Sequence, residues 1–351
     1  MESFLNLKVI AIKHETPDSV TVYLQNINDE KIKYLSGQFL TLVFEINGKE
    51  IRRSFSLSSI PDIDNDLAIT VKRIANGEIS NYIYRHLAIG DVIQSLHPSG
   101  RFILSNTNYK RDVFMIAAGS GVTPLFSIIK TKLLQDSDSR IILIYSNRDE
   151  LSTIFYDELN NLQNAYKENF ICIYIFSEPE NKNRMYKGHL SLELLRSLIE
   201  LNLKYKKQDA IFMLCGPFDY MRNAEMIIIA MGFDKSQLKK ENFVVIAEQE
   251  AINTAPVQEA GDKFVSIKYQ GQNFDLTVPF GKPILKAALE QGIKLPYSCQ
   301  GGICGTCSAI CTAGKISMSI NDVLTPKELK LGWILTCVGY PLTKNADIEY
   351  V

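Results

Sequence analysis

Four of the seven cysteines in the chain lie in one glycine-rich stretch, PYSCQGGICGTCSAIC, at residues 296–311. Cys299, Cys304 and Cys307 have the spacing C-x4-C-x2-C, and Cys337 follows thirty residues after the last of them. Three thiolates on one loop and a distant fourth form the plant-type pattern of ligands for a [2Fe–2S] cluster. The spacing therefore predicts a carrier of single electrons that is held by these four thiolates.

The other residues of the stretch suit such a loop. Gly301, Gly302 and Gly305 have no Cβ atom, so backbone N–H groups can approach the sulfur atoms closely. Cys311 is the surplus thiol and lies in SAICTAG, which has the pattern of a strand. We expect it to be a small buried hydrophobic residue and no ligand.

Disulfides and zinc are the alternatives for this cysteine cluster. The number of cysteines is odd, and the first residues show no basic segment followed by the apolar core of a signal peptide. Zinc ribbons usually pair two CxxC sequences, and this chain has one. We therefore favour the cluster, expect a cytoplasmic protein, and keep zinc as the alternative.

The composition is that of a soluble globular protein, with 46% hydrophobic and 22% charged residues. A length of 351 residues predicts two or three domains. The chain has no run of eighteen apolar residues, which predicts that nothing spans a membrane. The net charge of −1 argues against nucleic acid as the main partner.

The first two domains differ in their hydrophobic rhythm. Residues 1–105 contain short alternating strands, with Asn47-Gly48 as a hairpin turn, and this predicts an antiparallel β-barrel. Residues 106–246 alternate continuous apolar strands with helices, which predicts a doubly wound parallel α/β sheet. Ligands bind such sheets at the carboxyl ends of the strands.

A polar, alanine-rich segment at residues 247–262 is the predicted linker. Residues 263–351 then form a β-rich domain of ferredoxin size, with two strands around QGQ and a helix in KPILKAALEQG. The cysteine loop follows this helix.

Two turns carry further chemistry. In AAGSGVTP, Gly119 and Gly121 stand between a buried strand and a helix, where open N–H groups attract phosphate, although the full GxGxxG fingerprint is missing. RSFS, residues 53–56, is expected at the start of the strand that follows the hairpin. An arginine beside an aromatic ring and a hydroxyl is able to bind a phosphate and a flat ring.

In their order, these motifs resemble the ferredoxin–NADP reductase family with a plant-type ferredoxin fused at the C-terminus. RSFS matches the flavin motif R-x-[YF]-[ST], GEISNYI at 77–83 matches the Gly-x-x-Ser turn, and PSGRF at 98–102 matches P-x-G-x-F. GSGVTP and CGPFDYM match the two nucleotide segments, and ENF at 241–243 resembles an E-x-F stretch near the nicotinamide. The domain order is similar to that of oxygenase reductases, including the reductase component of phenylacetyl-CoA epoxidase, and implies a C-terminal β-grasp domain.

The resemblance implies a role for each matching residue. Arg53 would neutralise a flavin phosphate, Phe55 would pack beside the isoalloxazine, and Ser56 would bond near N5. The flavin residues implied are Arg53, Ser54, Phe55, Ser56, Val71, Gly77, Ile79 and Ser80. The nucleotide residues implied are Gly119, Gly121, Thr123, Pro124, Asn147, Arg148, Cys215, Gly216, Pro217, Met221 and Phe243. The catalytic residues implied are Ser56, Cys215 and Glu241, with a buried strand-end thiol as the alternative for Cys215.

The motifs also distinguish between cofactors. FMN-type members lack the paired GxxS and PxGxF motifs, so their presence favours FAD over FMN. The second nucleotide strand ends in Asn147-Arg148-Asp149-Glu150, which offers an arginine for a 2′-phosphate and acids for a ribose. Similar reductases with Asn-Arg here prefer NADPH, so we favour NADPH and keep NADH as the alternative.

The ferredoxin segment 263–351 has nine lysines, no arginine and six acidic residues, a balance of +3. Free plant ferredoxins are acidic and dock on basic partners, so we expect this domain to take electrons from its own flavin domain and to meet an acceptor that is not strongly basic. The resemblance implies an NAD(P)H-dependent reductase that serves an electron-accepting protein, most of all an oxygenase component. The alternatives are a stand-alone reductase for other carriers or a hybrid-cluster protein, and a non-enzymatic zinc module.

Overall fold

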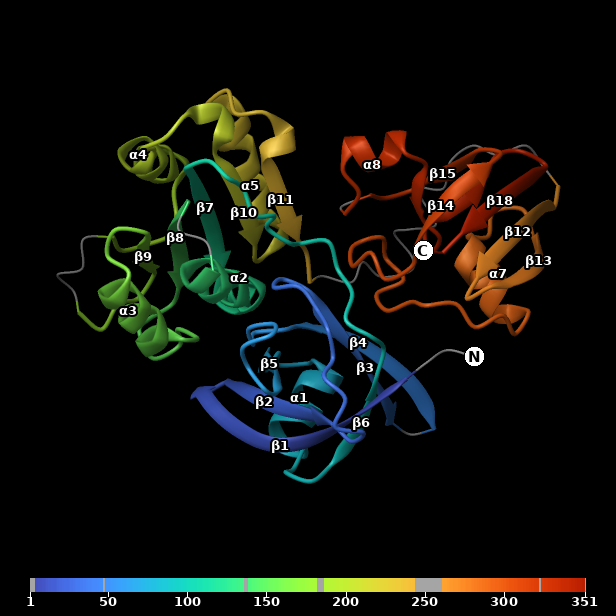
Figure 1. The fold of residues 1–351 in the computed structure, drawn as a ribbon, viewed down its shortest axis with the longest axis horizontal. Coiled ribbons are helices and arrows are strands. Elements are labelled where there is room, and N and C mark those ends of the chain that lie inside the picture. Colours follow the sequence, from blue (N-terminus) through green and yellow to red (C-terminus); the bar gives the residue numbers. More distant parts are fainter. Residues whose placement is uncertain are drawn as a thin grey trace. The chain divides into compact units, whose positions relative to one another are not determined.

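The protein is described from a computed structural model (Figure 1). The residues that it describes are 4–46, 48–135, 138–181, 186–243, 261–321 and 323–350. The chain divides into two compact units. One holds Leu5–Ile51 and Phe55–Asn242, and the other holds Phe243–Val351 with Met1–Phe4 and Arg52–Ser54. The predicted linker at 247–262 lies outside the described residues except for its last two positions.

The N-terminal part of the larger unit is an antiparallel barrel. Its strands are β1 (Leu5–Thr16), β2 (Ser19–Asn26), β3 (Phe39–Ile46), β4 (Lys49–Ser56), β5 (Leu67–Lys72) and β6 (Val92–Ser95), with helix α1 (Glu78–Arg85) after β5. The sheet order is β4-β3-β6-β1-β2-β5. Leu57, directly beyond β4, bridges to Ile69 of β5, so the two edges of the sheet meet. The expected barrel is therefore present.

Strand alternation explains the barrel core. Val20, Val22 and Leu24 lie on one face of β2 and are fully or almost fully buried, as the period of two requires. β3 and β4 are neighbours, and Gly48 between them has a φ of 72°, which agrees with the predicted hairpin. RSFS occupies the second half of β4 and not its start, because the strand already begins at Lys49.

The second part of the larger unit is a parallel sheet. Its strands are β7 (Arg111–Ala118), β8 (Ser139–Asn147), β9 (Phe170–Phe176), β10 (Ile211–Cys215) and β11 (Leu238–Glu241). Its helices are α2 (Val122–Gln135), α3 (Tyr156–Ala165), α4 (Leu192–Asn202) and α5 (Phe218–Ala230), with single 3₁₀ turns at Gly119–Gly121, Lys207–Asp209 and Lys235–Gln237. The strand order is β11-β10-β7-β8-β9.

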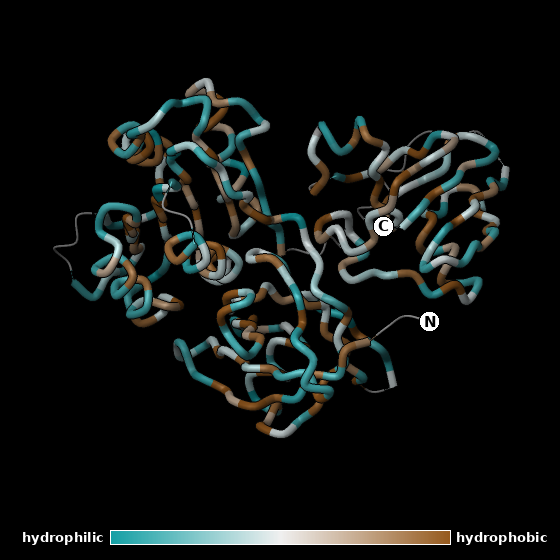
Figure 2. Tube along the Cα trace, in the orientation of Figure 1, coloured by the Kyte–Doolittle hydropathy of each residue, from teal (hydrophilic) through white to brown (hydrophobic). Residues whose placement is uncertain are grey.

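Helices cover both faces of this sheet. Residues of α2 and α3 pack in one core and residues of α4 and α5 in another, because alternate side chains of each buried strand point to opposite faces. Figure 2 shows the hydrophobic residues as brown stretches between teal ones along the chain. The chain runs from β7 outward to β9 and returns to β10 on the other side of β7. The direction in which the chain adds successive strands to the sheet thus reverses between β7 and β10. A crevice for ligands is expected at this point of the sheet.

The C-terminal unit has a mixed sheet in the order β13-β12-β18-β14-β16. Its elements are β12 (Lys263–Tyr269), β13 (Gln272–Val278), α7 (Ile284–Glu290), β14 (Ser308–Ala313), β15 (Ile316–Met318), α8 (Pro326–Lys330), β16 (Trp333–Leu335), β17 (Gly339–Pro341) and β18 (Asn345–Glu349). The two strands around QGQ, the helix after them and the strand over SAICTA are where the sequence predicts them. In the part of the chain that the structure describes, no helix is long and apolar enough to cross a membrane.

Candidate cofactor-binding and electron-transfer sites

The loops after β7 and β10 meet at the reversal point of the parallel sheet. A Cβ atom on Gly121 would lie 2.1 Å from the Cys215 carbonyl oxygen, and one on Gly216 would lie 3.2 Å from the Ala118 Cβ. Gly121 therefore has to be glycine for the two loops to touch. The Gly119 carbonyl accepts a hydrogen bond of 3.0 Å from the Tyr145 hydroxyl, which fixes the turn. The turn Gly119–Gly121 leads directly into α2, and the Val122 N–H already bonds to the Gly119 and Ser120 carbonyls, so the N–H groups open to a diphosphate are those of the turn itself.

Three residues expected to bind the nucleotide are buried next to this loop. Thr123 is 1% exposed, and its hydroxyl donates to the Ser120 carbonyl at 2.9 Å. Pro124 is buried in the first turn of α2, and Met221 lies on the buried face of α5. Their side chains thus shape the loops, while Pro217 precedes α5 as its N-terminal cap.

The end of β8 carries an open donor. The Asn147 Nδ2 atom is buried beside the Tyr145 hydroxyl and has no hydrogen-bond acceptor among the described residues. A buried donor without a partner is costly, so this amide fits a ligand at the crevice. Arg148 is exposed, and its Nε donates to Asp149 Oδ2 at 2.9 Å.

Both acids after Arg148 are already engaged. Asp149 Oδ1 accepts the Ser152 N–H at 2.7 Å, and Glu150 Oε2 accepts the Glu180 N–H at 2.9 Å. Burial opposes ionisation of Asp149, but hydrogen bonds from Arg148 and Ser152 outweigh it and lower its pKa. Both carboxylates are thus partly engaged by other groups of the chain.

Ser56, Cys215 and Glu241, which we name the proton-holding group, come together where β4 ends. Cys215 and Glu241 are register neighbours in β10 and β11, and the Ser56 hydroxyl donates to Glu241 Oε2 at 3.2 Å. Burial of the carboxyl group raises the pKa of Glu241 to about 8, although the Ser56 hydrogen bond opposes the rise. Burial, followed by the nearby Glu241, raises the pKa of Cys215. Both groups therefore hold a proton at neutral pH.

The barrel residues of the predicted flavin site lie on β4, β5 and α1. Arg53 is exposed, Phe55 is half-buried against the barrel core, and Val71 and Ile79 are 2% and 3% exposed. The side chains of Val71 and Ile79 pack in the core of the barrel. Only the backbone of these two residues is therefore left to contact a flavin.

The turn before α1 is tightly built. A Cβ on Gly77 would lie 2.4 Å from the Ser80 Oγ, and that hydroxyl donates to the Gly77 carbonyl at 3.2 Å and accepts the Ile74 N–H at 3.1 Å. No side chain caps the start of α1. Its open N–H groups suit a phosphate of FAD.

The four predicted cluster cysteines form three contacting pairs in the C-terminal unit, which are Cys299 with Cys304, Cys299 with Cys337, and Cys307 with Cys337. Hydrogen bonds from Cys304 and Cys337 lower the pKa of Cys299, and the pKa values of Cys304 and Cys337 rise through the same bonds. Cys337 also bonds with Cys307. Both Cys307 and Cys337 are buried, and the other two thiols are partly exposed.

Backbone features shape the cysteine cage. Gly302 and Gly305 both have a φ of 75°, and the Gly301 N–H donates to the Cys299 Sγ at 3.4 Å. A loop that brings thiols together and places a backbone N–H donor on one sulfur atom is suited to a [2Fe–2S] cluster. Thr336 holds the distant ligand in place, since its hydroxyl donates to the Cys307 carbonyl at 3.0 Å.

Two points differ from the sequence analysis. Cys311 is half-buried and not buried, because one side of β14 packs on the core while its thiol donates to the Ala313 carbonyl at 3.3 Å near the surface. Thr336 was not predicted, and its only sequence signal is its place beside Cys337. Phe243, which the resemblance assigns to the nucleotide site, is 43% exposed.

Comparisons with protein families match three domains along the chain. Residues 6–103 match an oxidoreductase FAD-binding domain, residues 115–226 an oxidoreductase NAD-binding domain, and residues 267–342 a 2Fe-2S iron-sulfur cluster binding domain. The last match overturns the zinc alternative. Together with the sites described above, the three matches define an NAD(P)H-dependent iron–sulfur flavoprotein oxidoreductase that uses FAD and a [2Fe–2S] cluster.

Relatives match the chain over its whole length. A component of the 1,2-phenylacetyl-CoA epoxidase of Escherichia coli (strain K12) is 32% identical, and the match covers 100% of this chain and 98% of the relative. The ferredoxin reductase component of 3-ketosteroid-9-alpha-monooxygenase from Rhodococcus rhodochrous is 30% identical, with coverage of 98% and 96%. The chain belongs to the family of ferredoxin–NADP reductase-type flavoproteins with a fused C-terminal plant-type [2Fe–2S] ferredoxin domain. The solved phthalate dioxygenase reductase shares the fold, with a TM-score of 0.61, 22% identity and coverage of 99% and 98%.

Proposed function

We propose that this protein is the reductase component of a multicomponent oxygenase, resembling that of phenylacetyl-CoA epoxidase. The observation that carries the proposal is the match of the entire chain to proteins that are named as parts of oxygenases. When bound, the nicotinamide supplies a hydride, FAD divides its two electrons, and the [2Fe–2S] cluster passes them on singly. A stand-alone reductase has no comparable support.

The residues of the chain supply binding, orientation and proton storage. The guanidinium of Arg53 and the start of α1 neutralise the flavin phosphates. Gly119 and Gly121 cradle the nucleotide diphosphate, and Ser56 and Glu241 keep a proton at the flavin end of the crevice. Cys299, Cys304, Cys307 and Cys337 hold the cluster.

NADPH is the proposed electron donor. Arg148 is exposed at the end of β8, where the 2′-phosphate of the adenosine ribose would lie. Asp149 and Glu150 already accept hydrogen bonds from the chain, so the ribose 2′-hydroxyl that distinguishes NADH would share these carboxylates with those donors. The unpaired amide of Asn147 adds a donor for the nucleotide.

The proposed domains are 1–105 for FAD, 106–246 for NADPH, 247–262 as the linker, and 263–351 for the cluster. The balance of +3 in the last domain suits an acceptor surface that is not strongly basic. Relatives of 32% and 30% identity serve a phenylacetyl-CoA epoxidase and a ketosteroid monooxygenase, so their names give the acceptor as an oxygenase component in general. We place the protein in the cytoplasm, where NADPH is available.

A pull-down with the full chain, followed by reconstitution, tests this function. The protein captured should be an oxygenase component, and NADPH oxidation should accelerate only when that component and its substrate are both present. Product should form in step with NADPH consumption. Capture of a ferredoxin, a flavodoxin or a hybrid-cluster protein that is reduced at a comparable rate, with no oxygenase among the partners, would contradict the proposal.

A further inference from the structure

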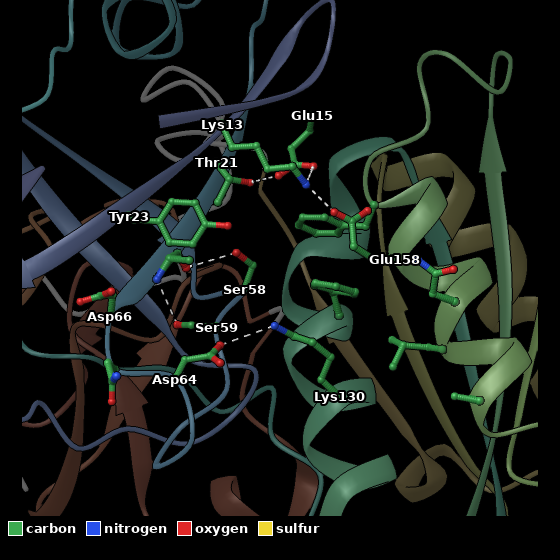
Figure 3. A pocket seen from close by; sticks show the side chains of 17 residues that line it. Lys13, Glu15, Thr21, Tyr23, Ser58, Ser59, Asp64, Asp66, Lys130 and Glu158 are labelled. Carbon is green, nitrogen blue, oxygen red and sulfur yellow. Dashed lines mark hydrogen bonds and ion pairs between the residues drawn. The ribbon is translucent and has the colours of Figure 1, made fainter. Parts of the chain in front are cut away.

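A cavity of about 710 Å³ lies between the flavin barrel and the nucleotide domain (Figure 3). Its walls come from β1, β2 and the segment 58–68 on the barrel side and from α2 and α3 on the other side. The described lining residues include none of those assigned above to the flavin, the nucleotide or the proton-holding group. The cavity is therefore a second place where the two domains face each other.

The first bridge across this cavity is an ion pair between Lys13 of β1 and Glu158 of α3. The Lys13 ammonium also contacts Glu15 Oε2 at 2.9 Å. The Glu15 side chain is 4% exposed, and its other oxygen accepts the Thr21 hydroxyl at 2.7 Å. Glu15 is thus anchored in the barrel and holds Lys13 toward Glu158.

The charge state of Lys13 supports this bridge. Burial alone would lower the pKa of Lys13, but hydrogen bonds to Glu158 and Glu15 outweigh burial and raise it. Lys13 is therefore an ammonium ion at neutral pH. Its side chain is 47% exposed and that of Glu158 is 37% exposed, so dissolved salt reaches the pair and weakens it.

The second bridge joins Lys130 of α2 to Asp64 of the barrel, with 3.7 Å between Nζ and Oδ2. The same Asp64 oxygen accepts the Ile60 N–H at 2.7 Å, which fixes the carboxylate to the barrel. The Lys130 ammonium lies 4.5 Å from the centre of the Phe126 ring, which fixes the lysine to α2. Each partner is thus held by its own domain.

One further contact lies between the same elements. The Ser127 hydroxyl of α2 donates to the Ser59 carbonyl of the barrel at 2.5 Å, and both residues are buried. This hydrogen bond joins α2 to the barrel at one point, and the two ion pairs join α2 and α3 to it at two further points.

We propose that the ion pairs Lys13–Glu158 and Lys130–Asp64 are positioning elements for hydride transfer, which set the angle between the flavin barrel and the nucleotide domain. The flavin site is built on one of these domains and the nucleotide site on the other. The reacting atoms must approach within roughly 3–3.5 Å, and small misplacements slow such reactions strongly. Contacts that fix the angle of the domains therefore act on the rate of flavin reduction without touching either ligand.

The test is the anaerobic reduction of bound flavin by saturating NADPH, followed by stopped-flow absorbance on the full-length holoprotein. Lys13→Met and Glu158→Gln should each slow this step by about three- to tenfold, given the modest strength of exposed pairs and the sensitivity of the step to geometry. The double variant should be no slower than either single variant, because both remove the same contact. Lys130→Met and Asp64→Asn repeat the test at the second bridge.

The salt dependence of the rate of flavin reduction distinguishes positioning by ion pairs from a purely structural role of these residues. The wild-type rate at saturating NADPH should fall toward that of a variant that lacks both ion pairs as salt approaches about 1 M, where the screening length is about 3 Å, and that variant should respond little. The control is Lys268→Met with Glu349→Gln, an ion pair of 2.7 Å within the ferredoxin domain whose side chains are 57% and 40% exposed. It should leave the rate unchanged.

Two results would overturn the proposal. Flavin reduction within about twofold of wild type in the variants of both bridges would show that the angle does not depend on them. A slower rate accompanied by loss of FAD from the variants would place the effect in flavin binding and not in positioning.

Discussion

Glu241→Gln should change how the stability of the flavin–nucleotide unit depends on pH. Burial raises the pKa of Glu241 to about 8 in the folded chain, compared with 4.5 for an unperturbed glutamate. Below about pH 4.5 the carboxyl is protonated in both the folded and unfolded states, and its burial has no ionisation cost. Between that value and about 8, only the unfolded state loses the proton, so the free energy of unfolding falls as pH rises.

The size of this effect follows from the two pKa values. Each pH unit of difference is worth about 1.4 kcal/mol, so the wild type loses up to about 4–5 kcal/mol between these limits relative to a glutamine variant. Ser56→Ala removes the hydrogen bond that lowers the pKa of Glu241 and should extend the loss to higher pH.

The assay is urea unfolding of the full chain, followed by the fluorescence of released flavin, at several values from about pH 5 to about pH 8.5. The difference in unfolding free energy between wild type and Glu241→Gln isolates this one carboxyl from all other titrating groups. As pH rises, the wild type should become steadily less stable relative to the Glu241→Gln variant. A difference that stays constant across the range would refute the reasoning about Glu241.

Three further outcomes are expected from single substitutions. Cys337→Ser should abolish the electron paramagnetic resonance signal of the reduced cluster while FAD stays bound, and Cys311→Ser should keep the signal; loss in both would overturn the ligand assignment. Arg53→Ala should raise the dissociation constant for FAD by roughly ten- to a hundredfold, since it removes a charge-assisted phosphate contact, whereas the exposed Arg85→Ala should not; equal FAD retention in both variants would count against the role. Gly121→Ala should weaken NADPH binding but not FAD content, because its Cβ would lie 2.1 Å from a carbonyl oxygen; an unchanged dissociation constant for NADPH would contradict the close contact of the loops.

The sequence predicts those features that depend on local patterns. Strand and helix periods, the hairpin at Gly48 and the glycine turns are local, and they identify a barrel, a doubly wound sheet and a ferredoxin-like domain. The spacing of Cys299, Cys304 and Cys307 is local as well. The distant Cys337 is found only because the plant-type pattern includes it.

Contacts between distant segments are not predictable in this way. Lys13 and Glu158 lie 145 residues apart, and nothing in the sequence near either of them indicates the other. The half-exposed position of Cys311 depends on how β14 packs in its sheet, which a strand pattern of six residues does not specify. Resemblance to a family places Ser56 near the flavin and Glu241 near the nicotinamide, but it does not predict the hydrogen bond between them.

The central claim is that electrons enter through the nucleotide and flavin sites and leave through the cluster held by the four cysteines. The most direct test compares wild type with Cys304→Ser in NADPH-driven reduction of two acceptors. Ferricyanide, which takes electrons from the flavin, should be reduced by the variant at close to the wild-type rate. Reduction of a one-electron protein acceptor, cytochrome c or the oxygenase component, should be almost lost. Reduction of the protein acceptor at the wild-type rate by a variant without the cluster would contradict the account.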